Sequence, residues 1–156
     1  MIIRNKVPYS WNVPIIATLL FVFISLPGLK APLHGDESTT YLEHVSSSLS
    51  QVIFHYTGPN QHTLFTILSN ASMRFFGEYE FTFRLPVLLA AIVSIFLIYY
   101  LGQTLWNYST AIIASLLTIG SYHHYYWAQH GRGYALTEML ALSSLLGIIL
   151  LLEENS

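Results

Sequence analysis

Long apolar stretches separated by short polar ones dominate the chain, and their lengths predict membrane-spanning helices. A helix of roughly 20 mostly apolar residues crosses a hydrocarbon core of about 30 Å. Because unpaired backbone groups are costly in lipid, such stretches are expected to be helical. Four of them are long enough, at about residues 11–29, 83–102, 108–126 and 134–152. Pro86 falls in the first turn of the second stretch, where a missing N–H costs little.

Residues 30–82, between the first two predicted spans, show helical periodicity instead of one long apolar run. From Thr40 onward, apolar residues recur at Tyr41, Val45, Leu49, Val52 and Tyr56. Thr40 and Glu43 fit a capping box at the start of this helix. A second helix is predicted on the apolar positions Leu64, Leu68, Ala71 and Phe75, with Gly77 as its C-cap. Both have a polar face, so we expect them to lie along the membrane surface.

The pattern therefore predicts an all-α fold in one module over residues 1–156: a polytopic membrane bundle of four spans with two amphipathic surface helices. Composition agrees, because 53% of residues are hydrophobic and only 9% are charged. The net charge of −2, with six Lys and Arg, argues against nucleic acid as a partner. The absence of cysteine excludes disulfides and thiolate metal sites.

Arg4 and Lys6 precede the first span and place the N-terminus in the cytoplasm, because the first helix usually sets orientation. The apolar run is too long for a signal peptide and no A-x-A site follows it. In this orientation, loop 30–82 and the segment "YYWAQHGRGY" lie on the same, non-cytoplasmic face. We expect a multi-pass protein of the plasma (inner) membrane whose active face is outward, although the arginines and lysine of the outer loops do not favour this orientation.

The polar chemistry of the chain gathers on that predicted outer face. Asp36 and Glu37 are adjacent just beyond the first span, where they could take a proton from a nucleophile or hold a divalent cation. Alternatively, Asp36 could simply cap the helix that follows. Seven histidines also fall on this face, namely His34, His44, His55, His62, His123, His124 and His130. No two of them have the H-x-x-x-H spacing of a helical zinc site, so a metal is not assigned.

Three motifs in order resemble the N-terminal part of the GT-C glycosyltransferases, and most closely family 39, the protein-O-mannosyltransferase and aminoarabinose-transferase-like group. These are the Asp36–Glu37 pair after the first span, "GPNQHTLFTILSNASMRFFGEYEFTFRLPVLLAAI" and "YYWAQHGRGYAL". The resemblance covers residues from about Lys30 to Leu142. The chain departs from the family pattern at His130, where the family has Glu in "QEAR", and at "QHTL", where it has a "PPL" element.

The resemblance implies an enzyme that transfers a sugar from a polyprenyl-phosphate carrier to an acceptor hydroxyl on the non-cytoplasmic face. Asp36 matches the family's essential acidic residue, the general base, and Glu37 is its motif partner. Arg132, with Gln129 beside it, is the candidate that stabilises the leaving phosphate. The other substrate-binding candidates are His62 and Arg84. For Arg84, a snorkelling role at a helix end is an equally good interpretation.

Two other functions fit the sequence. One is a non-catalytic four-helix membrane module or partner subunit, which the short length favours. The other is a metal or proton-coupled transport element built on the histidines and Glu138, an ionisable residue within the fourth predicted span. Because family enzymes have many more spans, we expect these residues to need the remainder of a longer chain, or a second subunit, for turnover.

Overall fold

The computed structural model of the protein describes residues 10–56, 58 and 61–154. Within these residues every regular element is a helix, as the sequence predicts. Three helices are long and apolar enough to span a membrane: α1 (Asn12–Leu29), α5 (Glu80–Leu105) and α8 (Tyr134–Glu154). They correspond to the first, second and fourth predicted spans. The chain therefore has the architecture of a multi-pass membrane protein.

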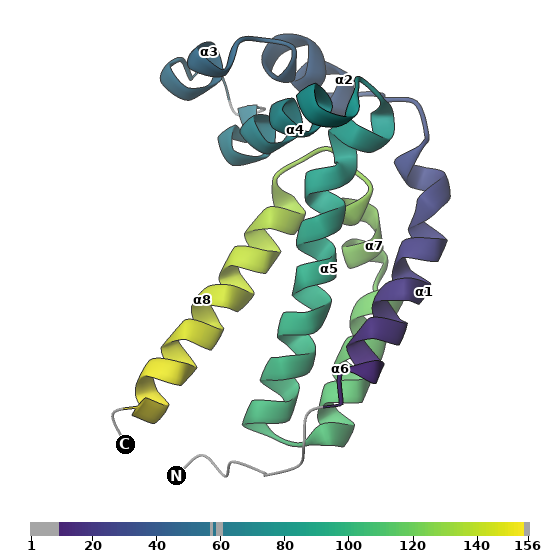
Figure 1. Cartoon of the computed structure of the whole chain (residues 1–156), viewed down its shortest axis with the longest axis vertical. Helices are drawn as coiled ribbons and strands as arrows, with labels where there is room; N and C mark the ends of the chain where they lie inside the picture. Colours follow the sequence, from purple (N-terminus) through teal and green to yellow (C-terminus); the bar gives the residue numbers. More distant parts are fainter. Residues whose placement is uncertain (1–9, 57, 59–60, 155–156) are drawn as a thin grey trace.

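Helix α5 is the centre of the bundle, between α1 and α8 (Figure 1). Apolar side chains pack on both of its sides. One cluster joins it to α4 (Thr63–Phe76) and α8 and includes Phe65, Phe83 and Val87. The other joins it to α1 and α7 (Tyr122–Ala128) and includes Phe21 and Ile95. This central position explains why α5 buries more of its surface than either α1 or α8.

The single helix predicted over residues 108–126 is not observed. The chain forms α6 (Tyr108–Gly120) and then α7, with Ser121 extended between them at φ −73° and ψ 121°. The Ser121 hydroxyl accepts a hydrogen bond from the backbone N–H of His124 at 3.5 Å, so Ser121 caps α7. Serine is a preferred N-cap, and it competes here with continuation of the helix. Together, α6 and α7 return the chain to the end of the bundle from which α5 starts (Figure 1).

At that end, a layer of short helices covers the bundle (Figure 1). It consists of α2 (Asp36–Thr40), the π-helix η1 (Tyr41–Val45), α3 (Leu49–Phe54) and α4. The continuous helix predicted from Thr40 to Tyr56 is therefore wrong. The side-chain amide of Asn70 donates to the carbonyls of Val45 at 2.6 Å and Ser47 at 3.1 Å, which stabilises the break.

The capping box predicted at Thr40 and Glu43 is also absent, because Thr40 is itself helical and its side chain makes no cap bond. Ser48 and Gln51 form a capping box instead, at the start of α3. The second helix predicted in this segment is confirmed as α4. Gly77 follows it with φ 95°, a left-handed conformation that glycine adopts without strain.

Two serines of α4 hold it against the start of α5. The sequence predicts Pro86 in the first turn of its helix. Because α5 begins at Glu80, Pro86 lies in the second turn instead. A proline at this position leaves the Thr82 carbonyl without its usual partner, the N–H of residue 86. The Ser72 hydroxyl donates to that carbonyl at 2.7 Å. The Ser69 hydroxyl donates to the neighbouring Phe83 carbonyl at 2.9 Å. Side chains of α4 thus supply hydrogen-bond donors to the backbone carbonyls of α5 next to the proline.

Candidate functional site

A pocket of about 330 Å³ opens between the start of α2 and the turn that joins α7 to α8. These segments are about 90 residues apart in the sequence, and they lie at the same end of the bundle. The pocket is lined by His34, Gly35, Asp36, Glu37, Tyr126, Trp127, His130, Arg132 and Tyr134. Three of the six predicted site residues, Asp36, Glu37 and Arg132, are therefore brought together.

Glu37 forms a buried, bidentate ion pair with Arg84 of α5. The Arg84 Nε donates to Glu37 Oε1 at 2.8 Å, and Nη2 donates to Oε2 at 2.6 Å. The backbone N–H of Gly131 also donates to Glu37 Oε1, at 2.6 Å. Only 1% of the Arg84 side chain and 3% of the Glu37 side chain are exposed. This one carboxylate thus joins α2, α5 and the turn before α8.

Arg84 also holds the end of α1 in place. Its Nη1 donates to the carbonyls of Gly28 at 3.0 Å, Leu29 at 3.3 Å and Ala31 at 2.5 Å. These carbonyls lie in the last turn of α1 and just beyond it, where the regular hydrogen bonding of the helix ends. In this geometry Arg84 neither snorkels toward water nor presents a donor to a phosphate in the pocket. Its interactions are those of a structural residue that positions the elements around the site.

Asp36 occupies a quite different environment from Glu37. Its side chain is 72% exposed, and its Oδ2 lies 2.6 Å from Arg132 Nη1 in an ion pair at the mouth of the pocket. The helix-cap interpretation of Asp36 is wrong, because the N-cap of α2 is Gly35 and Asp36 is already in the helix. Gly35 turns the chain into α2 with φ 56°, a conformation that few other residues adopt. An exposed carboxylate beside a guanidinium can accept a proton from a hydroxyl group in the pocket.

His62 is a second hydrogen-bond partner of Arg132. The Arg132 Nε donates to His62 Nε2 at 2.9 Å, and the His62 ring packs edge-on against Tyr134 at 5.5 Å. Accepting this bond requires an unprotonated Nε2, so His62 is neutral here. Burial and the neighbouring Arg132 guanidinium lower the pKa of His62, while Asp36 acts in the opposite direction. His62 also has φ 27°, the only positive φ at a non-glycine residue in the described part of the chain.

Gln129 does not line the pocket. It is buried, its Nε2 donates to the Tyr125 carbonyl at 3.0 Å, and its amide packs against Gly28 at the end of α1. A Cβ at Gly28 would lie 1.5 Å from Gln129 Oε1, so only glycine permits this close approach. The structure thus separates Gln129 from Arg132, although the two are close in sequence.

Aromatic rings form one wall of the pocket, and the sequence pattern predicts no role for them. His130 stacks on Tyr126 with centroids 3.8 Å apart, and its Nδ1 lies 2.7 Å from the Tyr126 carbonyl. Trp127 packs against Tyr134 at 4.0 Å. The aromatic residues in "YYWAQHGRGY" are visible in the sequence. Their convergence is not, because it depends on the turn between α7 and α8.

No three His, Asp or Glu side chains of the described residues are grouped so that they could hold a metal ion. In particular, Asp36 and Glu37 do not form a paired site for a divalent cation. Glu37 is committed to Arg84 and Gly131, whereas Asp36 is paired with Arg132.

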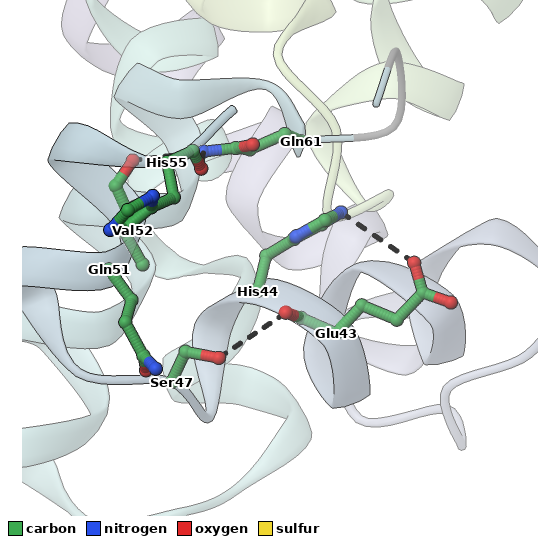
Figure 2. Close-up of a pocket in the computed structure, with 7 residues that line it drawn as sticks. All are labelled: Glu43, His44, Ser47, Gln51, Val52, His55 and Gln61. Atoms are coloured by element: carbon green, nitrogen blue, oxygen red, sulfur yellow. Dashed lines mark hydrogen bonds and ion pairs between the residues drawn. The ribbon is translucent and has the colours of Figure 1, made fainter. Parts of the chain in front are cut away.

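A second pocket, of about 230 Å³, lies within the layer of short helices formed by α2, η1, α3 and α4, here called the surface layer, and is shown in Figure 2. Its lining residues are Glu43, His44, Ser47, Gln51, Val52, His55 and Gln61. Several of their polar groups form hydrogen bonds within the segment 43–61 itself. The Gln61 Nε2 donates to the Val52 and His55 carbonyls at 2.9 and 3.1 Å, and the Ser47 hydroxyl donates to the Glu43 carbonyl at 3.3 Å. We therefore interpret it as a gap between short helices.

Comparison with protein-family models, curated proteins and solved structures found no match to this chain.

Proposed function

We propose that the protein is the N-terminal part of a membrane glycosyltransferase that uses a polyprenyl-phosphate-linked sugar donor. The observation that carries this proposal is the Asp36–Arg132 ion pair in a pocket with an aromatic wall. The elements that line the pocket lie at one end of a bundle of long apolar helices, where a lipid-linked donor and an acceptor could meet. The three motifs that resemble family 39 support the same function.

In the proposed reaction, the acceptor hydroxyl oxygen attacks the anomeric carbon of the donor sugar. The bond between that carbon and the phosphate oxygen breaks, and polyprenyl phosphate leaves with the bonding electrons. Asp36 takes the hydroxyl proton as general base. Arg132 stabilises the negative charge on the phosphate, a role that suits the planar guanidinium group.

Asp36 and Arg132 pair with each other in the structure, which suggests an order of events. A donor phosphate that binds Arg132 replaces Asp36 as its partner. The Asp36 carboxylate is then available to the acceptor hydroxyl. His62, which accepts a hydrogen bond from Arg132 Nε at 2.9 Å, keeps the guanidinium in the pocket during this exchange.

Within this proposal, Glu37, Arg84 and Gln129 are positioning residues. The Glu37–Arg84 pair fixes the start of α2, and so fixes Asp36 relative to the turn that carries Arg132. Gln129 packs that turn against α1. None of the three has to contact the donor.

We further propose that α6 and α7 together make a fourth crossing of the membrane, interrupted at Ser121. They return the chain from the far end of α5 to the start of α8, alongside α1 and α5 (Figure 1). The pocket then faces the non-cytoplasmic side of the plasma membrane, as expected from Arg4 and Lys6 before the first span.

Replacement of Asp36 by Asn tests the proposed base. The amide has the same size but accepts a proton poorly, so transfer from a polyprenyl-phosphate sugar should fall about 10²–10⁴-fold in membranes that contain the protein and any chain that completes it. Glu43→Gln is the matched control, since Glu43 is exposed in the same surface layer but lies outside the Asp36 pocket. Equal activity of Asp36→Asn and wild type would exclude Asp36 as the base. A non-catalytic membrane module would transfer no sugar at all.

A further inference from the structure

The break between α6 and α7 coincides with a separate pocket of about 300 Å³. It is lined by Leu117, Thr118, Ser121, His123, His124 and Glu138, and it shares no lining residue with the Asp36 pocket. In a membrane, non-helical backbone is tolerated where it is buried in protein or lines a polar cavity. Interrupted helices of this kind often mark binding sites, because their ends present unpaired backbone groups.

An ionisable pair occupies this pocket. The His124 Nδ1 lies 3.0 and 3.1 Å from the two carboxylate oxygens of Glu138 in α8. The His124 side chain is only 4% exposed and packs against Phe21 of α1, whereas the Glu138 side chain is 34% exposed. The carboxylate therefore faces the pocket, and the imidazole holds it from the protein side.

The hydrogen bonds of His124 indicate the charge of the pair. Its Nε2 is buried and has no hydrogen-bond partner among the described residues. A protonated Nε2 would be a buried donor left unsatisfied, which is more costly than a buried lone pair. The favoured state is thus a neutral ring whose Nδ1–H donates to an ionised Glu138. The pair then carries one negative charge, and no Lys or Arg lines the pocket to balance it.

We propose that this pocket binds a primary ammonium group, with the head group of an aminophospholipid as its source. An ammonium group offers three N–H donors and one positive charge. The Glu138 carboxylate, which uses only part of its acceptor capacity on His124, supplies the countercharge. Thr118 and Ser121 line the same pocket. The Thr118 hydroxyl donates to the Ala114 carbonyl at 2.9 Å and the Ser121 hydroxyl accepts from the His124 N–H at 3.5 Å, and each oxygen retains acceptor capacity for an ammonium group.

Position favours a lipid over a soluble amine. Glu138 is in the second turn of α8, close to the end of a helix long enough to span the membrane. Tyr122 and Trp127, residues of the kind found at membrane interfaces, flank His123 and His124 in α7. A head group at this depth can place its ammonium in the pocket while its acyl chains stay beside the exposed apolar residues Leu116 and Leu117 of α6.

The test compares lipids that differ only in the methylation of the amine. The full chain is reconstituted in phosphatidylcholine nanodiscs that contain phosphatidylethanolamine or its mono- or dimethyl derivative, and retained lipid is counted by native mass spectrometry. Each methyl group removes one N–H donor, so retention should fall in steps, by about tenfold between the unmethylated and the fully methylated lipid. Equal retention across the series would overturn the proposal without any need for a variant.

A pair of variants then locates the site. Glu138→Gln should lower phosphatidylethanolamine retention to the phosphatidylcholine level, whereas Glu154→Gln, an exposed carboxylate at the other end of the same helix, should not. Unchanged retention in Glu138→Gln would contradict the assignment. A separate titration with free ethanolamine distinguishes the sources: displacement of the bound lipid at low concentration would favour a soluble amine, and no displacement supports the head group.

Discussion

At the residue scale, the buried Glu37–Arg84 pair should contribute more to stability than any exposed charge at the site. Arg84→Met would leave the Glu37 carboxylate buried without its main partner, and the carbonyls at the end of α1 would lose a donor. Breaking a buried ion pair in this way typically costs about 3–5 kcal/mol. We expect Arg84→Met to lower the thermal unfolding temperature in detergent micelles markedly.

The matched change is at the Asp36–Arg132 pair, in which Asp36 is 72% exposed and Arg132 only 10% exposed. An ion pair with one solvated member contributes less than a buried one, and the amide oxygen of Asn can still accept from Arg132, so Asp36→Asn should lower the unfolding temperature much less than Arg84→Met. If Asp36→Asn were as damaging as Arg84→Met, the division into a structural and a chemical carboxylate would be wrong.

His62 should make stability depend on pH. Its pKa is lowered in the folded protein, so the unfolded chain takes up a proton first as the pH falls. The stability contributed by neutral His62 is complete above about pH 6.5, the usual pKa of the side chain, and is lost as the pH falls from there through the folded pKa. Unfolding temperatures measured from pH 7.5 to pH 5 should decrease.

Asn is a suitable replacement for His62, since it does not titrate and tolerates a positive φ. The difference in unfolding temperature between wild type and His62→Asn isolates the effect of this histidine from that of the other six. That difference should shrink as the pH falls below 6.5. A difference independent of pH would show that the pKa of His62 is not lowered in the folded protein, contrary to its burial and its contact with Arg132.

The sequence predicts Asp36, Glu37, His62, Arg84, Gln129 and Arg132 as site residues, and the structure places five of them in two adjoining sets of contacts, Glu37 with Arg84 and Asp36 with Arg132 and His62. The sequence could not show which of the two carboxylates, Asp36 or Glu37, is exposed. Adjacent residues at the start of a short helix point in different directions, and only the position of Arg84 on α5 decides that Glu37 is the buried one. Gln129 is predicted from its closeness to Arg132 in sequence, but its side chain packs against Gly28 of α1 and does not line the pocket.

At the scale of elements, a glycine controls how closely the α7–α8 turn approaches α5. A Cβ at Gly131 would lie 1.9 Å from Phe83 Cε1. Phe83 is fully buried and packs edge-on against Phe65 at 5.3 Å, so its ring cannot easily move. Gly131→Ala should therefore destabilise the protein by about 1–3 kcal/mol, as overpacking does.

Gly147→Ala is the corresponding control within a helix. Apart from the backbone of its own helix, nothing lies within 4 Å of a Cβ at Gly147, and alanine is more stable than glycine in a helix interior by roughly 0.5–1 kcal/mol. We expect this variant to unfold at a slightly higher temperature than wild type. Equal behaviour of the two alanine variants would mean that the turn is not held as close to Phe83 as the structure has it.

The long helices could be predicted because hydrophobicity over about 20 residues is a strong signal. Breaks within helices could not. Ser121 interrupts an apolar stretch whose periodicity predicts a continuous helix. The end of η1 is stabilised by a hydrogen bond from Asn70, which lies in α4, 25 residues away from Val45. Such breaks depend on single side-chain hydrogen bonds, which a pattern of apolar positions does not contain.

At the scale of the whole molecule, the site is complete only if α6 and α7 together cross the membrane. Arg132 follows α7 and Asp36 follows α1, so their ion pair requires both helix ends to be on one side. Because the chain contains no cysteine, single cysteines can report this directly with an impermeant thiol reagent.

Three exposed positions give a complete test: Ser50 in α3, Ser109 at the start of α6 and Tyr134 at the start of α8. Cysteines at Ser50 and Tyr134 should be labelled from the same side of intact cells, and a cysteine at Ser109 only after the membrane is opened. α5 separates Ser50 from Ser109, and α6 with α7 separates Ser109 from Tyr134. If Ser109 and Tyr134 were labelled from one side, the interrupted pair would not span the membrane. The Asp36–Arg132 pocket could then not form across these helices, and the proposed glycosyl transfer would lose its site.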